Sequence, residues 1–137
     1  MGNRIRRRRG HAPVHCLYGE LGSGKTTFAQ GFAKGLGITT RLLSPTFIIV
    51  RRYRIPDNFG FLYHLDLYRV SSEKDLLGLG LLEILSDPDS IVFIEWAEKL
   101  GGLLPKERID VRFSVFENGK HHVSLSSSGL TRGSSLK

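Results

Sequence analysis

The sequence predicts one α/β domain with three layers, in which a mixed, mainly parallel sheet lies between helices and carries an inserted antiparallel hairpin. Two observations predict it. The short apolar run His15–Tyr18 leads into a glycine-rich loop and then into a helical pattern, which is the order of a strand, a turn and a helix. Further apolar runs at residues 61–68 and 91–94 are separated by a second helical pattern, and a helical crossover makes the strands that it joins parallel.

The first helix follows the glycine-rich loop. Its apolar residues recur at helical spacing and define one face: Phe28, Ala29, Phe32, Ala33 and Leu36. Gly37 suits the position just after the helix, where a left-handed backbone is common. Gly31 and Gly35 lie within the helix, and their separation by one turn predicts close packing of this helix against a neighbour.

The inserted hairpin is predicted from the next two β-regions. One begins near Phe47 and continues to Arg54, and the other covers residues 61–68. Residues 56–60 between them have the composition of a turn. The two runs are therefore expected to pair in antiparallel fashion.

A second helix is predicted to start after Ser71 or Ser72, with Asp75 placed to complete a capping box from Ser72. Gly78 and Gly80 weaken this helix near its start and can divide it in two. An Asp-Pro-Asp run then ends it.

The remaining strands come from three runs near the C-terminus. Residues 91–94 are continuously apolar, as in a strand buried on both faces. Residues 109–117 and 121–125 are predicted to be two closing strands, because Asn118-Gly119 between them is a strong hairpin-turn signal.

The composition is that of a soluble globular domain. The chain has 137 residues, of which 40% are hydrophobic and 24% are charged. No apolar run approaches the roughly 20 residues that span a bilayer, and the basic N-terminus lacks the apolar core of a secretory signal. Cys16 is the only cysteine, so no disulfide forms within the chain. We expect a buried structural thiol and a cytoplasmic location.

Positive charge is concentrated at the N-terminus. The net charge is +7, and five arginines near the start of the chain supply most of it. We expect residues 1–13 to be a flexible basic arm, residues 14–126 to be the folded domain, and the serine- and glycine-rich residues 127–137 to be a flexible tail. Contact between the arm and RNA phosphates is the alternative.

Residues 17–26 carry the most specific signal. Gly19, Gly24, Lys25 and Thr26 stand at the G-x-x-x-x-G-K-[ST] spacing of a phosphate-binding P-loop. Such a loop wraps phosphates with backbone N–H groups, which glycine allows because it lacks a Cβ. The lysine would reach the β- and γ-phosphates, and the threonine hydroxyl would hold Mg²⁺. The predicted fold is therefore P-loop NTPase-like; the alternative is a glycine-rich turn that has this spacing by chance.

Two carboxylates are candidates for binding the metal and positioning water. Glu95 directly follows the last core strand, and an acid at the tip of such a strand can bind Mg²⁺. The alternative for Glu95 is a surface residue at the start of a loop. Asp66 lies between two leucines, where an unpaired carboxylate would be costly. It can pair with Arg69 or His64, orient water or help to hold Mg²⁺, and the spacing leaves these options open.

Thr46 and Trp96 are further candidates. Thr46 belongs to a Ser-Pro-Thr-Phe segment that can act as a switch for the γ-phosphate or simply begin a strand. Trp96 follows Glu95 and can cover the nucleotide, although a lone tryptophan is more often part of a core or an interface. His121 and His122 would point to opposite faces of a strand, so we assign them no role, and no spacing typical of a zinc site is present.

Together these segments resemble the TsaE family, the small bacterial ATPases of tRNA threonylcarbamoyladenosine synthesis. The resemblance extends from about Leu17 to about Leu100 and rests on four segments in order: Gly19 to Thr27, Ser44 to Phe47, His64 to Arg69, and Ile94 to Trp96. A P-loop alone is shared by many families, whereas the ordered set in so short a chain is far more specific. In the family a helix and a short strand usually precede the P-loop strand and contribute to the nucleotide pocket. This chain has an arginine run there, which leaves adenine recognition unassigned.

The resemblance implies an ATP-binding, Mg²⁺-dependent ATPase. It also implies partners: the TsaD and TsaB subunits, which transfer threonylcarbamoyl to an adenosine of tRNA and which hydrolysis resets between turnovers. The tRNA itself would be reached indirectly or through the basic arm. The implied catalytic residues are Asp66, Thr46 and Lys25, and the implied metal ligands are Thr26, Glu95 and Asp66. The implied nucleotide contacts are Gly19, Glu20, Leu21, Gly22, Ser23, Gly24, Lys25, Thr26, Thr27 and Trp96.

Two other functions compete with this one. A small nucleotide or metabolite kinase would use the same P-loop, but no arginine cluster that could form a lid follows the sheet, and little sequence remains for a second substrate pocket. A degenerate P-loop protein that only docks RNA or a partner is disfavoured because Lys25, Thr26 and Glu95 are all intact.

Overall fold

The computed structural model describes residues 12–20, 24–42, 49–56 and 60–128. These residues form a six-stranded sheet with the order β2-β3-β4-β1-β5-β6. The strands are β1 (Val14–Tyr18), β2 (Val50–Arg54), β3 (Phe61–Asp66), β4 (Ile91–Glu95), β5 (Arg108–Val115) and β6 (His121–Ser128). β1 pairs in parallel with β4 and β5, and β3 pairs in parallel with β4. The pairs β2–β3 and β5–β6 are antiparallel, so the predicted mixed, mainly parallel sheet with an inserted hairpin is confirmed.

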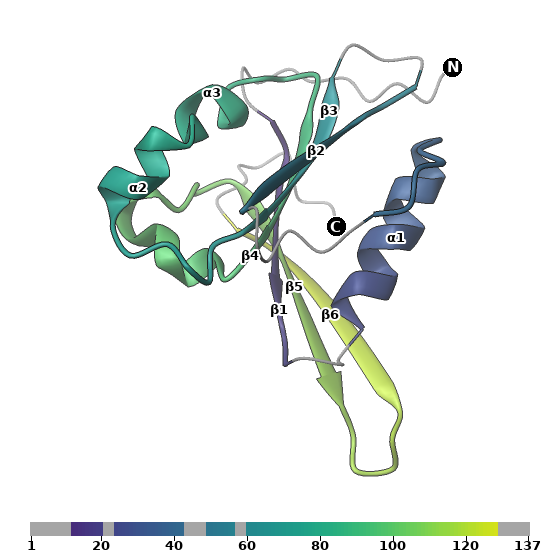
Figure 1. The fold of residues 1–137 in the computed structure, drawn as a ribbon. Coiled ribbons are helices and arrows are strands. Elements are labelled where there is room, and N and C mark those ends of the chain that lie inside the picture. The colour runs from purple at the N-terminus through teal and green to yellow at the C-terminus, as the bar shows by residue number, and fades with distance from the viewer. Residues whose placement is uncertain (1–11, 21–23, 43–48, 57–59, 129–137) are drawn as a thin grey trace.

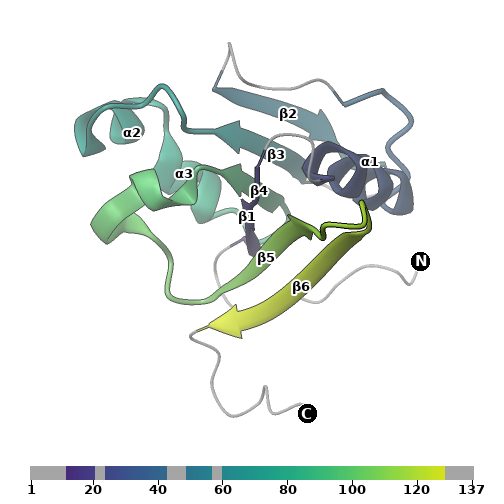
Figure 2. The same cartoon turned by 90° about the horizontal axis from the view of Figure 1, so that it is seen from below.

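Helices cover both faces of the sheet (Figure 1). They are α1 (Lys25–Gly35), α2 (Glu73–Gly78), α3 (Leu81–Leu85) and the 3₁₀ helix η1 (Ala97–Leu103). α1 lies on one face and the other three lie on the opposite face, an arrangement that Figure 2 shows from below. The predicted three layers are therefore confirmed. Among the helices of the described ranges, none is long and apolar enough to cross a membrane.

Each face of the sheet has its own apolar core. The continuous apolar run of β4 contributes to both, because successive side chains of a strand point to opposite faces. On one side Phe93 packs with Ala29 and Ala33 of α1. On the other side Ile94 packs with Leu76 and Leu100 of the opposite helical layer. The strands that carry the site are thus fixed by packing from both sides.

α1 ends where the sequence predicts. Gly37 has a φ of 89°, and its N–H donates to the carbonyl of Lys34 at 3.0 Å, which is the left-handed end expected of a glycine. The prediction for Gly31 and Gly35 is wrong. Both face solvent, and a Cβ added at either would meet no atom within 4 Å. The helix packs on the sheet through its alanines, so its glycines do not mark a close contact.

The second predicted helix is divided in two, as its glycines suggested. Ser72 caps α2 by accepting a hydrogen bond from the N–H of Asp75 at 3.2 Å. The return half of the capping box differs from the prediction, because the Asp75 carboxylate accepts from the N–H and hydroxyl of Ser71 at 3.3 and 2.9 Å. Gly80, with a φ of 80°, breaks the helix before α3.

Several boundaries differ from the sequence prediction, and three of them bear on the site or on the ends of the domain. β3 ends at Asp66, two residues early, because Leu67 and the residues after it form a turn. β6 continues to Ser128, paired with Arg108 of β5, so the start of the predicted tail is strand; residues 129–137 lie outside the described residues. At the other end Ala12 is buried, and its N–H donates to the carbonyl of Leu85 at 2.8 Å. The end of the predicted arm is thus anchored, whereas residues 1–11 are not described.

Candidate functional site

The candidate site lies where the carboxyl ends of β1, β3 and β4 meet the N-terminus of α1. In open α/β sheets, ligands bind at this edge. Gly19 and Glu20 follow β1, and Gly24 precedes α1 with a φ of 108°, a conformation that favours glycine. Three predicted loop residues, Leu21, Gly22 and Ser23, lie outside the described residues, and so does Thr46.

The N-terminus of α1 is suited to an anion. It has no side-chain cap and no acidic residue in its first turn, so its first N–H groups and the positive end of its dipole face the loop. Thr26 and Thr27 are exposed there. Negatively charged phosphate oxygens are the ligands that such a helix end favours.

Lys25 bridges the loop and the sheet. Its Nζ donates to the carbonyl of Gly19 at 2.7 Å and lies 3.6 Å from Oε1 of Glu95. The lysine and glutamate side chains are only 15% and 13% exposed, so their attraction is screened less than that of a surface pair. The predicted P-loop lysine and the predicted strand-tip acid are therefore brought together.

Glu95 is the last residue of β4, and its two carboxylate oxygens have different partners. Oε2 is 2.9 Å from Nε2 of His64 on β3, whereas Oε1 faces Lys25. Burial raises the pKa of the Glu95 carboxyl, but the hydrogen bond with His64 and the charge of Lys25 outweigh burial and hold that pKa below its ordinary value. The group is therefore ionised at neutral pH.

Asp66 ends β3 directly beside Glu95. The parallel register pairs the two residues, so both carboxylates leave the sheet at the same level and on the face that α1 covers. Asp66 is 6% exposed, and its Oδ1 accepts a hydrogen bond from the N–H of Tyr68 at 3.0 Å. The sequence offered His64 as one possible partner of Asp66, whereas in the structure His64 contacts Glu95.

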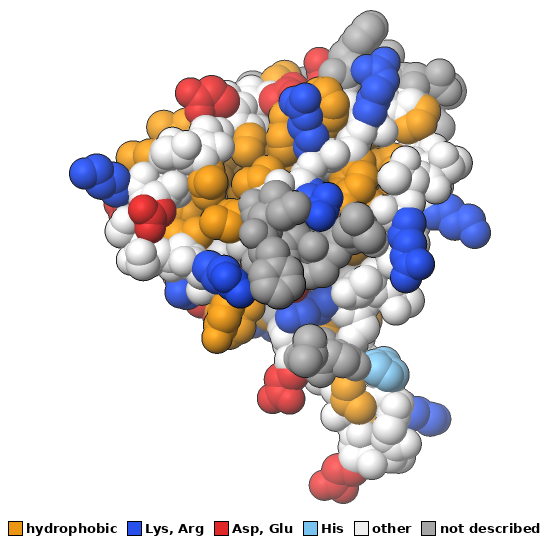
Figure 3. Space-filling view, in the orientation of Figure 1, with side chains coloured by type: hydrophobic (Ala, Val, Ile, Leu, Met, Phe, Trp, Pro, Cys, Tyr) orange, Lys and Arg blue, Asp and Glu red, His pale blue; other side chains and the backbone are white. Residues whose placement is uncertain are grey.

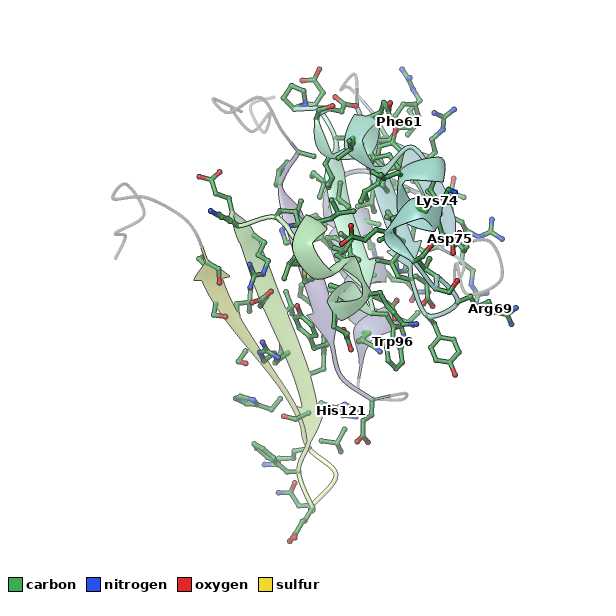
Figure 4. The ribbon with its side chains drawn as sticks, turned by 90° about the vertical axis from the view of Figure 1, so that its left-hand side faces the viewer. Phe61, Arg69, Lys74, Asp75, Trp96 and His121 are labelled. Carbon is green, nitrogen blue, oxygen red and sulfur yellow. The ribbon has the colours of Figure 1, made fainter. Side chains whose placement is uncertain are left out.

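Two aromatic side chains border the site. Trp96 has a left-handed backbone with a φ of 63°, which turns the chain sharply after β4. Its ring packs against the Tyr68 ring with centroids 5.0 Å apart and a tilt of 53° between the ring planes. Trp96 is 41% exposed and Tyr68 is 55% exposed. In Figure 4, Trp96 and Arg69 lie between Phe61 at the top of the view and His121 on the hairpin below. Nothing in the sequence pairs Tyr68 with Trp96, although Tyr68 ends one predicted strand and Trp96 follows another.

The β5–β6 hairpin reaches the loop as well. A Cβ added to Gly24 would lie 3.8 Å from Nδ1 of His121 and 3.9 Å from the ring of Phe113. His121 had been assigned no role, and the length of the hairpin is what brings it beside the loop. The Asn-Gly turn sets the register of the hairpin, and it was the only sequence signal that could have indicated that His121 lies near Gly24.

The donor set fits Mg²⁺. This ion prefers carboxylate, hydroxyl and phosphate oxygens and is usually held by one or two carboxylates together with the phosphates of a substrate. Glu95 and Asp66 supply two carboxylates at one edge of the sheet, and the exposed Thr26 adds a hydroxyl beside the loop. Within the described ranges, no three His, Cys, Asp or Glu side chains form a cluster able to hold a metal alone.

Other predicted or notable groups lie away from this chemistry. Cys16 is buried, and burial raises the pKa of its thiol to about 11, which agrees with a structural role. A cavity of about 530 Å³ opens at the C-terminal end of α1, beside Lys34 and Arg41. The C-terminal end of α1 is the negative end of the helix dipole, so this cavity is less suited to phosphates than the N-terminus of the helix.

Basic side chains gather over β2, the edge strand (Figure 3). The strand has the sequence Val-Arg-Arg-Tyr-Arg, and Arg52 and Arg54 are exposed. The Arg52 guanidinium lies over the ring of Phe61 at 4.4 Å. The described domain therefore carries a basic surface of its own, in addition to the arginines of the N-terminal region.

The fold and the loop sequence together define a P-loop NTPase-like protein, in which a glycine-rich segment joins β1 to α1 and α1 begins at Lys25 at the carboxyl edge of the sheet. The chain belongs to the TsaE family. The family model described as "Threonylcarbamoyl adenosine biosynthesis protein TsaE" matches residues 1–123, so the resemblance inferred from the motifs is confirmed.

Relatives and a solved structure agree with this assignment. Proteins named "tRNA threonylcarbamoyladenosine biosynthesis protein TsaE" from Borreliella burgdorferi and Bacillus subtilis are 44% and 43% identical to the chain, over 78% and 72% of it. The matches cover 77% of the first relative and 59% of the second, so the chain spans less than two thirds of the Bacillus protein. The crystal structure of Bacillus subtilis YdiB is similar with a TM-score of 0.69 and 32% identity, and the match covers 90% of this chain and 73% of that one.

Proposed function

We propose that this protein binds ATP with Mg²⁺ and hydrolyses it as a subunit required for threonylcarbamoyladenosine modification of tRNA. The observation that carries the proposal is the approach of Lys25 to Glu95, 3.6 Å apart at the N-terminus of α1. Phosphoryl transfer needs a cation for the phosphates, a carboxylate for the metal and a donor-rich helix end. All three meet at this edge of the sheet.

Each residue has a proposed task. The loop and the first turn of α1 hold the phosphates through backbone N–H groups, and Lys25 leaves the Gly19 carbonyl to reach the β- and γ-oxygens. Thr26 and Glu95 hold the metal, while Asp66, fixed by the turn at Tyr68, orients the attacking water. Mg²⁺, when bound, would neutralise charge that develops on the phosphates. Thr46 remains the proposed switch residue, and Trp96 the proposed cover of the nucleotide.

The proposed partners are TsaD and TsaB. The relatives' names refer to tRNA threonylcarbamoyladenosine biosynthesis, which supports a place in that pathway. We propose that hydrolysis acts on the TsaD–TsaB complex and that tRNA is met indirectly or through the basic N-terminal arm. A small-molecule kinase remains the second candidate because it would use the same loop and metal residues.

The test is ATP turnover by the whole chain, with and without a TsaD–TsaB pair. Lys25→Ala should lower turnover by about 100-fold or more, because it removes the cation that stabilises the transferring phosphoryl group. Lys34→Ala is the matched control, since Lys34 is an exposed lysine in the last turn of the same helix, and it should leave turnover unchanged. Equal turnover in the two variants would exclude this loop as the site. Transfer of labelled phosphate to an added acceptor instead of water would favour the kinase.

A further inference from the structure

We propose that His64 is a positioning residue that holds one oxygen of Glu95 so that the other oxygen alone is presented to the cation of the nucleotide. The inference rests on the proposed function, because it concerns the metal that accompanies the phosphates. It adds a residue to which the family motif and the loop spacing assign no task at this site.

The contact is well defined. His64 is 4% exposed, and its Nε2 lies 2.9 Å from Oε2 of Glu95. A carboxylate only accepts hydrogen bonds, so Nε2 carries the hydrogen and donates it. The other ring nitrogen, Nδ1, is buried and has no hydrogen-bond partner in the described part of the chain. The ring therefore has a single polar task, and that task is to hold Glu95.

The register of β3 and β4 places His64 where it can contact Glu95. β3 and β4 are parallel neighbours in which His64 is paired with Phe93 and Asp66 with Glu95. His64 thus stands two pairs before the last pair of these strands and reaches forward to the glutamate at the end of β4. Because packing on both sides immobilises these strands, the histidine is a fixed reference point for a longer and more flexible side chain.

The second oxygen has a partner that can leave. Oε1 is 3.6 Å from Nζ of Lys25, and the lysine makes its shorter contact, at 2.7 Å, with the Gly19 carbonyl. When Lys25 turns to phosphates, Oε1 becomes available while Oε2 stays bound to His64. Without His64, both oxygens could turn to the lysine, and the resulting pair would compete with phosphate and metal.

Outer partners that orient a metal ligand typically contribute about 10- to 100-fold to metal affinity. Loss of His64 should therefore raise the Mg²⁺ requirement without altering how the loop itself holds phosphates. A role that is only structural would instead lower the stability and leave the Mg²⁺ requirement of the folded protein unchanged.

The experiment measures binding of a fluorescent ADP to the whole chain, in EDTA and across a Mg²⁺ titration. His64→Leu removes the donor, and His64→Asn keeps polarity on a side chain too short to reach Oε2. Each should raise the Mg²⁺ midpoint by about 10-fold or more and leave binding in EDTA unchanged. His64→Gln, whose amide N–H can replace Nε2, should restore the midpoint. His15→Leu is the control, since it removes a second buried histidine on the same face of the sheet.

The outcomes separate this inference from the proposed function. If the wild type shows a Mg²⁺-dependent affinity and the folded Leu and Asn variants share its midpoint, the positioning role is overturned and the proposed function stands. Failure of His64→Gln to rescue would likewise overturn it. If the wild type binds no nucleotide, the proposed function and this inference fall together.

Discussion

The carboxyl ends of β3 and β4 lie side by side and each carries a carboxylate, that of Asp66 buried and that of Glu95 partly buried, and the contacts of the two differ. Glu95 on β4 is held by side chains, His64 and Lys25. Asp66 on β3 accepts a hydrogen bond from the backbone N–H of Tyr68 in the turn that follows its own strand. A backbone donor stays in place when a ligand arrives, whereas a lysine can change partner. Under the proposed function, the backbone contact of Asp66 would therefore persist when the nucleotide binds, whereas the Lys25 contact of Glu95 would be exchanged.

The largest effect should come from Glu95→Gln. The substitution keeps the size of the side chain but removes the charge that faces the cation, and we expect hydrolysis to fall by about 1,000-fold, or about 4 kcal/mol. The apparent Mg²⁺ affinity should fall with it, while nucleotide binding in EDTA is kept. Turnover against Mg²⁺ concentration measures both effects. Glu98→Gln, an exposed acid in η1, is the control, and similar loss in both variants would show that Glu95 has no special role.

Asp66→Asn should have the next largest effect and a different signature. The amide oxygen can still accept from the Tyr68 N–H, so the turn is kept, but the basic oxygen that would orient water is gone. We expect hydrolysis to fall by about 100-fold with less than a roughly threefold change in Mg²⁺ midpoint, as measured in the same titration. A shift of the midpoint as large as that of Glu95→Gln would make Asp66 a metal ligand and remove the proposed division of tasks.

His15 offers a third way to sharpen the comparison, because it lies on the same face of the sheet but is surrounded by rings. Its ring centroid is 5.4 Å from that of Phe32 and 5.1 Å from that of Phe93. Burial lowers the pKa of His15 from 6.5 to about 4. As pH falls, the His15 ring is therefore protonated in the unfolded chain before it is protonated in the folded chain. The contribution of His15 to the free energy of unfolding is fully present above pH 6.5 and declines toward pH 4.

When the pH is lowered from 7.5 to 5, protonation of His15 in the unfolded chain should lower the unfolding free energy of the wild type by about 2 kcal/mol. Urea unfolding at the two pH values measures the loss. His15→Leu should be less sensitive to this change by about that amount, since an uncharged side chain takes up no proton. If the wild type and the variant lose equal stability, the acid sensitivity comes from other groups, and the carboxylates at the sheet edge become the first to examine.

Sequence reasoning located the parts of the site that local patterns encode. Lys25 follows from the loop spacing, Glu95 from an acid after a buried apolar run, and Asp66 from an acid between two leucines. The contact between His64 and Glu95 could not be predicted, because it depends on the register of two strands that are far apart in sequence.

The errors in the fold have the same origin. Gly31 and Gly35 have a spacing that suits close helix packing, but the direction in which they point depends on how α1 lies on the sheet, and they face solvent. The three serines at 126–128 have the composition of a tail, and only pairing with β5 makes them strand. The order of strands and helices was predictable because hydrophobic periodicity encodes it locally.

The smallest predicted effect lies at the other end of the same two strands. The buried Ser90 hydroxyl accepts from the N–H of Phe61 at 2.9 Å and donates to Asp87 at 2.6 Å, so it ties the amino ends of β3 and β4 together. Ser90→Ala leaves that N–H without its partner and should lower the unfolding free energy by about 1–2 kcal/mol, as measured by urea unfolding. Hydrolysis per folded molecule should not change, because the carboxyl ends keep their own contacts. Ser86→Ala is the control, because Ser86 is exposed. If hydrolysis per folded molecule falls in Ser90→Ala but not in Ser86→Ala, the two ends of these strands are coupled. The carboxylates would then depend on more than their local contacts.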